Sequence, residues 1–580
     1  MSSIYDDIVF KYALQNALKY GGKAKVKPVL NVILAEYPQL RPSAREILTL
    51  VEKAVKEVNS MSLTEQKRLA EEKYPEVLVE KATKEERKGL PPLPRVNEYP
   101  KIRTRFAPNP DFDIHLGNAR AAILSFEYAR MYNGDFILRF EDTDPRIKAP
   151  VENAYEVIRD NLQWLGLKWK EEYIQSLRME IYYEYATKLL EMGGGYICMC
   201  PSHKISEYRA RGIRCEHFNH SIEENLELWD RMLEGEFREG EVVLRVKTDP
   251  RFPDPSVRDW IAFRIIDSSK YPHPLVGDKY IVWPTYNFAC AIDDHLMNIT
   301  HVLRAKEHEA NTPKQEFLYA HFKWKYPVTI HFGKLKLEGV ILSKSKIKKG
   351  IEIGKYRGWN DLRLATLTAL RRRGILPETI WKIILDVGIK PVEAKISLVN
   401  LYAINRSFLE PRANRYMFVK NPVVLVIYNC TLDKAILPYH PSFPERGFRT
   451  IEIGRTDNMV KVFIPEDDAR KLRKNCKLRL LGLCNVKIVN VNDFRVESIF
   501  ISTDVKYAKK ERLPIIQWCP ENSVRVEVEK AVGDELVFDT GIAEPEVRKL
   551  PIGYIVQFIR YGFVKLEKKG EYISMVYVHN

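Results

Sequence analysis

The segment from residue 102 to residue 140 constrains the fold of this 580-residue chain more than any other. A short apolar run at 102–107 is followed by a turn at 108–111 and by helical spacing from Gly117 to Tyr132. Asn133 and Gly134 end that helix, and a second apolar run covers 136–140. A strand, a tight turn, a helix and a second strand open a doubly wound α/β domain. The sequence therefore predicts a Rossmann-like core.

The length of the chain requires further domains, because a single core rarely exceeds about 250–300 residues. Residues 1–95 have helical periodicity, with two expected N-terminal capping boxes, one from Ser43 to Glu46 and one from Ser62 to Glu65. A proline-rich stretch from Pro91 to Pro100 is typical of a linker. We therefore predict an N-terminal helical accessory domain at 1–95.

The pattern of predicted secondary structure divides the rest of the chain into further regions. We predict the first half of the core at 100–195, an insertion at 196–275, the second half of the core at 276–345, and a helical region at 346–415 with helices at 361–373 and 377–386. Residues 416–580 contain short strands with frequent turns, including an alternating run at 524–529 and a hairpin turn at 568–571. This pattern favours one or two β-barrels.

The charge of the chain favours a polyanionic partner. Lysine and arginine number 92 against 77 aspartates and glutamates, a formal net charge of +15. Such an excess suits nucleic acid, although solubility alone could explain it. The N-terminus lacks the apolar core of a signal peptide, no run of eighteen apolar residues is present, and the eight cysteines do not resemble a disulfide framework. We expect a cytoplasmic protein with reduced cysteines.

The tetrapeptide His115-Leu116-Gly117-Asn118 stands where the first strand meets the helix. Amides at a helix N-terminus point at bound phosphate, Gly117 lets a nucleotide approach the backbone, and His115 can donate to a phosphate oxygen. An ordinary turn histidine is the alternative. The segment resembles the H-I-G-H signature of class I aminoacyl-tRNA synthetases, in the glutamyl/glutaminyl branch, where the last position varies.

A second segment, Ile-Leu-Ser-Lys-Ser at 341–345, resembles the K-M-S-K-S loop of the same class. The resemblance implies that Ser343 and Lys344 bind ATP, with Lys344 neutralising charge on the phosphates as pyrophosphate leaves. The first lysine of that loop is Ile341 here, which removes one cation, as the glutaminyl branch tolerates. An ordinary basic surface loop is the alternative, since Lys346 and Lys348 follow.

Segments 103–108, 139–144 and 283–304 are similar to the glutamyl/glutaminyl pattern. The resemblance implies that Arg105 and Arg304 hold the carboxylates of the amino acid, that Tyr286 lines the side-chain pocket, and that Glu141 receives the ammonium group. Glutaminyl enzymes have a small neutral residue at the position of Arg304. Because arginine pairs bidentately with carboxylate, such a site discriminates against neutral glutamine by roughly 10⁴-fold. Glutamate is therefore the expected substrate.

Several residues in these segments have other interpretations. Arg105 could be an ion-pair partner between domains, and Asp293 and Asp294 could cap a helix instead of contacting substrate. Cys290 stands where bacterial relatives have asparagine, and we assign it no role from the sequence.

A cysteine–histidine cluster lies in the predicted insertion. Cys198, Cys200, Cys215 and His217 form two close pairs separated by a short loop, an arrangement that suits tetrahedral zinc. The spacings within the pairs are tighter than the usual C-x₂-C, so packed, reduced cysteines are the alternative. Some synthetases of the resembled family hold zinc in the same insertion.

The surface for tRNA is less sharply encoded. Residues 358–363 and 370–374 resemble the segment after the signature loop in glutaminyl and archaeal or eukaryotic glutamyl enzymes. The three arginines at 371–373 could contact phosphates or form a solvated helix end. The β-rich region resembles the anticodon-binding barrels of that group, whereas bacterial glutamyl enzymes are helical there. The chain is thus similar to class I glutamyl-tRNA synthetases of the archaeal type.

This resemblance implies a two-step reaction in which tRNA must bind before activation. The α-carboxylate of glutamate attacks the α-phosphate of ATP, with His115, Asn118, Lys344 and Mg²⁺ holding the phosphates, and the 3′-terminal adenosine of tRNA(Glu) then takes the glutamate. Charging of tRNA(Gln) is left open, and a monomer is expected. The rivals are a glutaminyl-tRNA synthetase, which Arg304 opposes, and an inactive tRNA-binding scaffold, which the intact motifs oppose.

Overall fold

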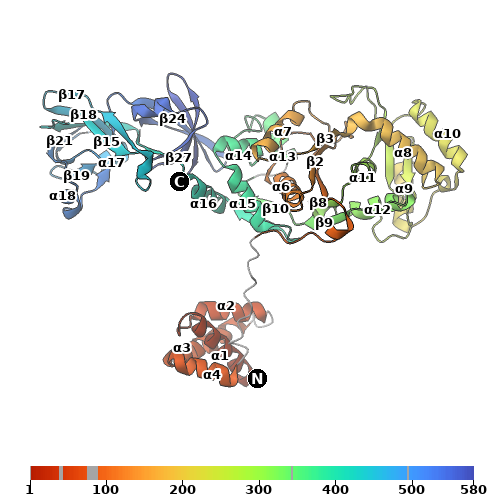
Figure 1. Ribbon diagram of the computed structural model, residues 1–580, viewed down its shortest axis with the longest axis horizontal. Helices are drawn as coiled ribbons and strands as arrows, with labels where there is room; N and C mark the ends of the chain where they lie inside the picture. The colour runs from red at the N-terminus through yellow and green to blue at the C-terminus, as the bar shows by residue number, and fades with distance from the viewer. Residues whose placement is uncertain (1, 38–42, 75–88, 341–343, 493–494) are drawn as a thin grey trace. The chain divides into compact units, whose positions relative to one another are not determined.

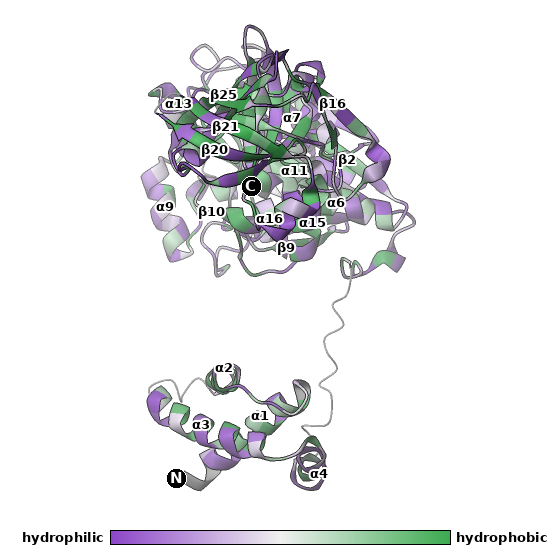
Figure 2. Cartoon of the chain, turned by 90° about the vertical axis from the view of Figure 1, so that its left-hand side faces the viewer, coloured by the Kyte–Doolittle hydropathy of each residue, from purple (hydrophilic) through white to green (hydrophobic). Residues whose placement is uncertain are grey.

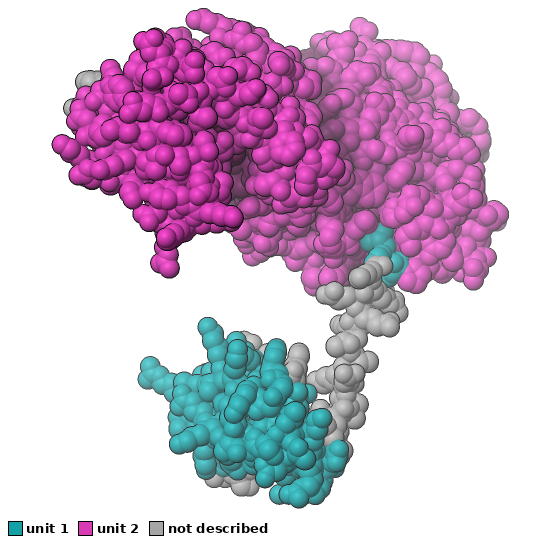
Figure 3. Space-filling view, turned by 60° about the vertical axis from the view of Figure 1, so that its left-hand side comes forward, with its two compact units in different colours: residues 1–91 teal, residues 92–580 magenta. Residues whose placement is uncertain are grey.

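The computed structural model describes residues 2–37, 43–74, 89–340, 344–492 and 495–580. The chain divides into two compact units, residues 1–91 and 92–580, which Figure 3 shows in separate colours. Within the described ranges, no helix combines the length and apolar character needed to cross a membrane.

In its described residues the first unit consists of helices packed around an apolar core of their own. Figure 2 labels these helices and colours them by hydropathy. They are α1 (Ser2–Lys19), α2 (Val26–Glu36), α3 (Ala44–Ser60) and α4 (Leu63–Lys73). The capping box predicted from Ser62 to Glu65 is present at the start of α4. The one predicted from Ser43 to Glu46 is wrong: Ser43 precedes α3 but makes no side-chain cap bond. Its backbone, at φ −98° and ψ 24°, is not in the extended conformation typical of an N-cap.

The second unit begins with the predicted Rossmann-like core, which the structure confirms. Strands β1 (Arg103–Phe106), β2 (Asp135–Phe140) and β3 (Glu171–Ile174) pair in parallel, with α6 (Leu116–Met131) and α7 (Ala154–Trp164) as crossovers. Strands β8 (His301–Ala305) and β9 (Val328–Phe332) form a second parallel pair, joined by α12 (Asn311–His321). The backbone N–H of Thr300 donates to the Arg103 carbonyl over 2.9 Å, which holds β8 beside β1.

The order of strands in this core has a functional consequence. From β1 the chain moves outward through β2 to β3, and β8, which pairs with β9, lies on the other side of β1. Figure 1 labels β2, β3, β8 and β9 in this core. Ligands of open α/β sheets bind outside the carboxyl ends of the strands where the order reverses. In this chain that point lies between the ends of β1 and β8.

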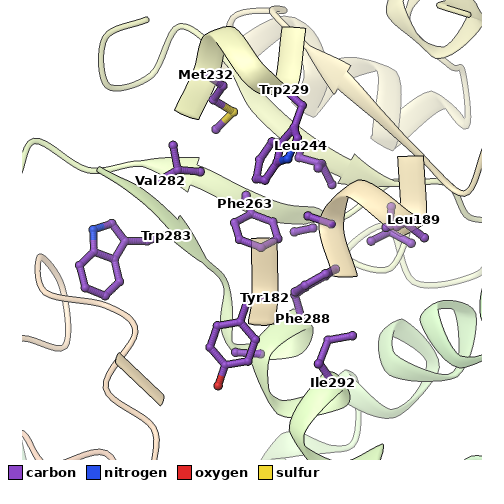
Figure 4. Close-up of a cluster of buried hydrophobic side chains, with 14 of the residues drawn as sticks. Tyr182, Leu189, Trp229, Met232, Leu244, Phe263, Val282, Trp283, Phe288 and Ile292 are labelled. Carbon is purple, nitrogen blue, oxygen red and sulfur yellow. The ribbon is translucent and has the colours of Figure 1, made fainter. Parts of the chain in front are cut away.

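The insertion packs tightly against the core. Its antiparallel sheet contains β4 (Gly195–Cys198), β5 (Val243–Val246), β6 (Ile261–Ile265) and β7 (Val282–Pro284), with α9 (Ser202–Arg211) and α10 (Ile222–Leu233) alongside. Trp229 and Phe263 share one apolar cluster with Tyr182 of α8 (Met179–Glu191) and Phe288 of α11 (Tyr286–Leu296), as Figure 4 shows. This shared core fixes the position of α11, which carries several site residues.

A helical region follows the core. Strand β10 (Leu335–Glu338) pairs in parallel with β11 (Ala394–Ser397), and the helices are α13 (Lys344–Glu352), α14 (Leu367–Arg373), α15 (Pro377–Val387) and α16 (Leu398–Leu409). The helix predicted at 361–373 is too long, because residues 361–366 are not helical. There the Asp361 carboxylate accepts hydrogen bonds from the backbone N–H groups of Arg357 and Arg363, and Thr366 caps α14.

The remainder forms two barrel-like sheets with separate apolar cores, as the β-rich sequence predicted. The seven-stranded sheet runs in the order β12 (Arg415–Tyr416), β26 (Ile555–Phe558), β27 (Gly562–Lys569), β28 (Ile573–His579), β24 (Val524–Val532), β25 (Glu535–Ala543) and β13 (Phe418–Lys420). The eight-stranded sheet runs β17 (Arg455–Thr456), β18 (Met459–Pro465), β14 (Pro422–Tyr428), β21 (Arg495–Ser502), β20 (Asn485–Val491), β19 (Lys477–Leu480) and β22 (Ile515–Ile516), with β23 (Cys519–Pro520) paired to β18.

Candidate active site

His115 is the N-cap of α6, at the carboxyl side of β1. Its Nδ1 accepts hydrogen bonds from the backbone N–H groups of Gly117 at 3.0 Å and Asn118 at 3.3 Å, and the Asn118 side-chain oxygen accepts from the His115 N–H at 3.2 Å. Because Nδ1 accepts, the ring proton lies on Nε2, which is therefore a donor. The imidazole lies over Gly117: a Cβ there would stand 2.8 Å from the His115 ring.

Arg105, on β1, belongs to a buried ionic network. Its guanidinium donates to the Asp294 carboxylate at 3.2 and 3.4 Å, and Arg139 of β2 donates to the same carboxylate at 2.8 Å and to Glu141 at 2.9 Å. Burial alone would raise the pKa of Asp294, but the two guanidinium groups outweigh it and lower that pKa to about 2. Asp294 thus stays ionised and compensates two buried cations.

The thiol of Cys290 lies inside this network. Its sulfur is 3.3 Å from an Arg139 nitrogen and 3.7 Å from an Arg105 nitrogen, and it donates to Asp294 at 3.5 Å. Burial raises the pKa of Cys290 to about 12, so the thiol stays protonated. The neighbouring Asp293 carboxylate accepts from Tyr182 at 2.7 Å and from Arg178 at 2.9 Å. Both aspartates therefore order side chains behind the pocket, and neither interacts as a helix N-cap.

Arg304, on β8, differs from Arg105 and Arg139 because its hydrogen-bond partners among the described residues are neutral. It donates to Gln315 at 3.1 Å, to Thr312 at 2.7 Å, to Tyr326 at 3.3 Å and to the His331 ring at 3.3 Å. It is 5% exposed. In the described ranges no carboxylate lies within ion-pairing distance of it. A buried guanidinium held in place without a counter-ion is a ready site for a ligand carboxylate.

Tyr286 begins α11, next to these arginines. Burial alone would lower the pKa of Arg105 and of Arg304, but neighbouring groups outweigh it and the pKa of each is raised. Asp294 is the main group that raises the pKa of Arg105, and Tyr286 and Cys290 act on both arginines. The structure therefore brings Arg105, Arg304 and Tyr286 into one electrostatic neighbourhood, with Glu141 attached through Arg139. Tyr286 also stands 6.1 Å from His308, ring centre to ring centre.

The predicted signature loop is only partly described. Ile341 to Ser343 lie outside the described residues, and Lys344 is the first residue of α13. The side chain of Lys344 also lies outside the description.

The four predicted metal ligands come together in the insertion. Their ligand atoms all lie within 4.8 Å of one another, with the sulfurs of Cys198 and Cys215 3.9 Å apart and the Cys200 sulfur 3.3 Å from Nδ1 of His217. Tetrahedral zinc would place two sulfurs about 3.8 Å apart and a sulfur and a nitrogen about 3.6 Å apart, given the usual bond lengths. The donor set therefore fits zinc in chemistry and in size.

The three arginines at 371–373 make protein contacts. Arg371 pairs with Asp160 at 2.5 Å, and Arg372 binds both Glu529 at 2.6 Å and Glu567 at 2.5 Å. Arg372 thus attaches α14 to strands β24 and β27 of the barrel. Arg373 donates to the Tyr402 hydroxyl at 3.0 Å.

Sequence reasoning missed the supporting residues of the pocket. The sequence places Arg139 and Cys290 in segments that resemble the family but indicates no role for them. It indicates nothing about Thr312, Gln315 and Tyr326. A signal existed for Arg139, a charged residue in the otherwise apolar run 136–140 of strand β2, two positions before Glu141. The residues around Arg304 lie on α12 and the segment after it, and no local signal marks them.

Comparisons with known proteins agree with this architecture. Residues 101–411 match the family model of the catalytic domain of tRNA synthetases class I (E and Q), and residues 413–506 match the anticodon-binding domain of the same family. The fold and the paired motifs thus define an aminoacyl-tRNA synthetase of class I. Within that class, the chain belongs to the family for glutamate and glutamine, E and Q.

Individual relatives span the whole chain. A glutamate–tRNA ligase of Pyrobaculum islandicum is 52% identical over 586 residues, covering 99% of this chain and 100% of the relative. That of Pyrobaculum calidifontis is 53% identical over 584 residues, with 99% and 100% covered. A crystal structure of a glutamate tRNA ligase from Elizabethkingia meningosepticum in complex with its amino acid is 23% identical, covers 54% of this chain and 70% of that chain, and has a TM-score of 0.40.

Proposed function

We propose that the chain is a glutamate–tRNA ligase, which uses ATP to form glutamyl-adenylate and transfers glutamate to the 3′-terminal adenosine of tRNA(Glu). The full-length relatives carry that activity in their names. The observation that carries the amino-acid assignment is Arg304, a buried guanidinium whose described partners are neutral. A glutamate side chain would supply the missing negative charge, and a glutamine side chain would not.

In the first step, the residues of the chain bind and orient the substrates. Arg304 takes the γ-carboxylate of glutamate, and Arg105 approaches the α-carboxylate while Asp294 holds its guanidinium in place. Glu141 receives the ammonium group. The α-carboxylate then attacks the α-phosphorus of ATP, the bond to the bridging oxygen breaks, and pyrophosphate leaves. No covalent enzyme intermediate is required, so positioning and electrostatics supply the catalysis.

The nucleotide phosphates lie at the start of α6. His115 donates through Nε2 because its Nδ1 is occupied by the backbone N–H groups of Gly117 and Asn118. The Asn118 side-chain oxygen serves the cap, which leaves its NH₂ group to donate to phosphate. Ser343 and Lys344 bind ATP, and the ammonium group of Lys344 neutralises charge on the departing pyrophosphate. Mg²⁺ bound to ATP would share that charge.

In the second step a ribose hydroxyl of the tRNA terminal adenosine attacks the adenylate carbonyl, and AMP leaves. The barrel-like sheets bind the anticodon region, in line with the matched anticodon-binding domain. Whether tRNA(Gln) is also a substrate depends on how those sheets read the anticodon. Monomeric state and cytoplasmic location stay predictions.

We also propose structural zinc at Cys198, Cys200, Cys215 and His217, supported by the spacing of their ligand atoms. Zinc would hold β4, which contains Cys198, to the short 3₁₀ helix Glu216–Asn219, which contains His217 and is preceded by Cys215. Its role there is to brace the fold of the insertion, with no part in the reaction.

Pyrophosphate exchange tests the function. Full-length protein with ATP and tRNA should exchange pyrophosphate when glutamate is supplied, and should do so far more slowly with glutamine. Glutamine-dependent exchange would identify the glutaminyl alternative. The absence of exchange with both, in protein that still binds tRNA, would identify the inactive scaffold. Charging of purified tRNA(Glu) and tRNA(Gln) in parallel answers the remaining question.

A further inference from the structure

Arg373, the last residue of α14, is, like Arg304, a buried arginine without a carboxylate partner among the described residues. It is 5% exposed. Its Nη1 donates to the Tyr402 hydroxyl at 3.0 Å, and its Nε has no hydrogen-bond partner in the described parts of the chain. An uncompensated buried charge is costly, and a buried N–H without an acceptor adds to that cost.

Acidic residues before α14 and on the adjoining barrel strands pair with other cations. Asp361 holds Arg363 at 2.7 Å, and both Glu529 and Glu567 hold Arg372. Residues 341–343, which lie outside the described residues, contain no acidic residue. The position of Arg373 at the C-terminal end of α14 offers some compensation from the helix dipole, but that effect is small beside the cost of burying a charge.

Arg373 lines a cavity of about 160 Å³. Its lining includes Gly339 and Val340, which follow β10, Tyr402 of α16, and Gly533 and Tyr577 of the barrel. A single water needs only about 10–15 Å³ of such space, so a phosphate-sized ion with a few waters can be accommodated. The Tyr402 hydroxyl accepts from Arg373, and its own proton is therefore available for another acceptor.

We propose that this cavity is an oxyanion site in which Arg373 and Tyr402 bind a phosphate group. The site is separate from the ATP site at His115 and is not needed for the chemistry described above. The phosphate is either a free inorganic ion or a backbone phosphate of bound tRNA, and the second source rests on the proposed function. Its occupancy would connect the barrel to Gly339 and Val340, immediately before the signature residues.

The first experiment measures thermal unfolding of the full chain while sodium phosphate replaces sodium chloride at constant ionic strength. The matched variants are Arg373→Met and Arg371→Met, neighbours on α14, of which Arg371 pairs with Asp160 outside the cavity. Wild type and Arg371→Met should show a saturable rise in Tm, about 2 °C at a hundredfold excess over Kd, beyond that of Arg373→Met. Phosphate binding at the ATP site is common to all three proteins and cancels in the comparison.

The second experiment measures tRNA affinity against salt concentration for the same variants. If a tRNA phosphate occupies the cavity, Arg373→Met should flatten the slope of log K against log salt by about one unit relative to Arg371→Met. Arg373→Lys, which keeps the charge, should retain most of the effect in either experiment. If neither the phosphate-dependent rise in Tm nor the salt slope distinguishes Arg373→Met from Arg371→Met, the site is refuted. Pyrophosphate exchange with glutamate, measured separately, decides the proposed function.

Discussion

The sharpest test of the glutamate pocket is to remove or neutralise the guanidinium of Arg304. In Arg304→Met, the γ-carboxylate of bound glutamate would be buried among Gln315, Thr312 and Tyr326 with no cation beside it. Breaking a buried ion pair by removing one partner costs about 3–5 kcal/mol. Since 1.36 kcal/mol is a factor of ten, kcat/KM for glutamate should fall by roughly 10²–10⁴-fold. Glutamine carries no charge at that position and should lose much less.

A companion variant neutralises the same guanidinium without removing it. Gln315→Glu places a carboxylate where the Gln315 amide oxygen now accepts from Arg304 at 3.1 Å. This internal carboxylate would compete with the substrate carboxylate for Arg304. The kcat/KM for glutamate should therefore fall, as in Arg304→Met, while the shape of the pocket is kept. Glu316→Gln, a charge change of equal size at the next, exposed position of α12, serves as the control.

The assay is tRNA-dependent pyrophosphate exchange, with kcat/KM measured separately for glutamate and glutamine. The reasoning predicts that the ratio of the two falls in Arg304→Met and in Gln315→Glu and is unchanged in Glu316→Gln. A ratio that stays constant in both pocket variants would show that Arg304 does not read the side-chain carboxylate.

Four further predictions concern the nucleotide motifs, the buried ion pairs and the zinc site. Gly117→Ala would place a Cβ 2.8 Å from the His115 ring, so the ring must move; pyrophosphate exchange should slow by about 10²-fold with little change in Tm, and an unchanged rate would remove His115 from phosphate binding. Lys344→Ala should slow activation by about 10²–10³-fold while Kd for tRNA is nearly unchanged; Lys348→Ala is the control, and equal rates in the two variants would contradict the assignment. Asp294→Asn should lower the free energy of unfolding by about 3 kcal/mol at pH 7. The folded pKa of Asp294, about 2, is below its ordinary value of 3.8, so its contribution to stability is present above pH 4 and is lost as pH falls toward 2. Denaturant unfolding should show that the difference in free energy of unfolding between wild type and variant shrinks over that range. A difference that stays constant would argue against the ion pairs. Mass spectrometry of metals should find about one zinc per chain in the wild type and in the barrel variant Cys476→Ser, and almost none in Cys215→Ser; equal zinc in both variants would rule out the site.

Local sequence patterns anticipated much of the fold. The strand at β1, the helix α6 and the strand β2 were expected within one or two residues of their observed ends, because period and turn chemistry are properties of neighbouring residues. The alternating strand β24 and the β27–β28 hairpin followed the same logic. Two local predictions failed. Ser43 has the right neighbours for a capping box but the wrong backbone conformation, and residues 361–366 are held in turns by the carboxylate of Asp361 instead of continuing a helix.

By itself, then, the sequence determined which segments are helices and strands, and its paired motifs indicated the chemistry of the nucleotide site. Only the tertiary structure decided which charges compensate one another. Arg139 and Asp294 are 155 residues apart and Arg372 and Glu567 are 195 apart, yet each pair is in contact. Arg304 and Arg373 are left without a described carboxylate, while Arg105 and Arg139 are paired, although all four look alike in the sequence. The reason is that burial and pairing depend on the folded positions of distant segments, which no local pattern encodes.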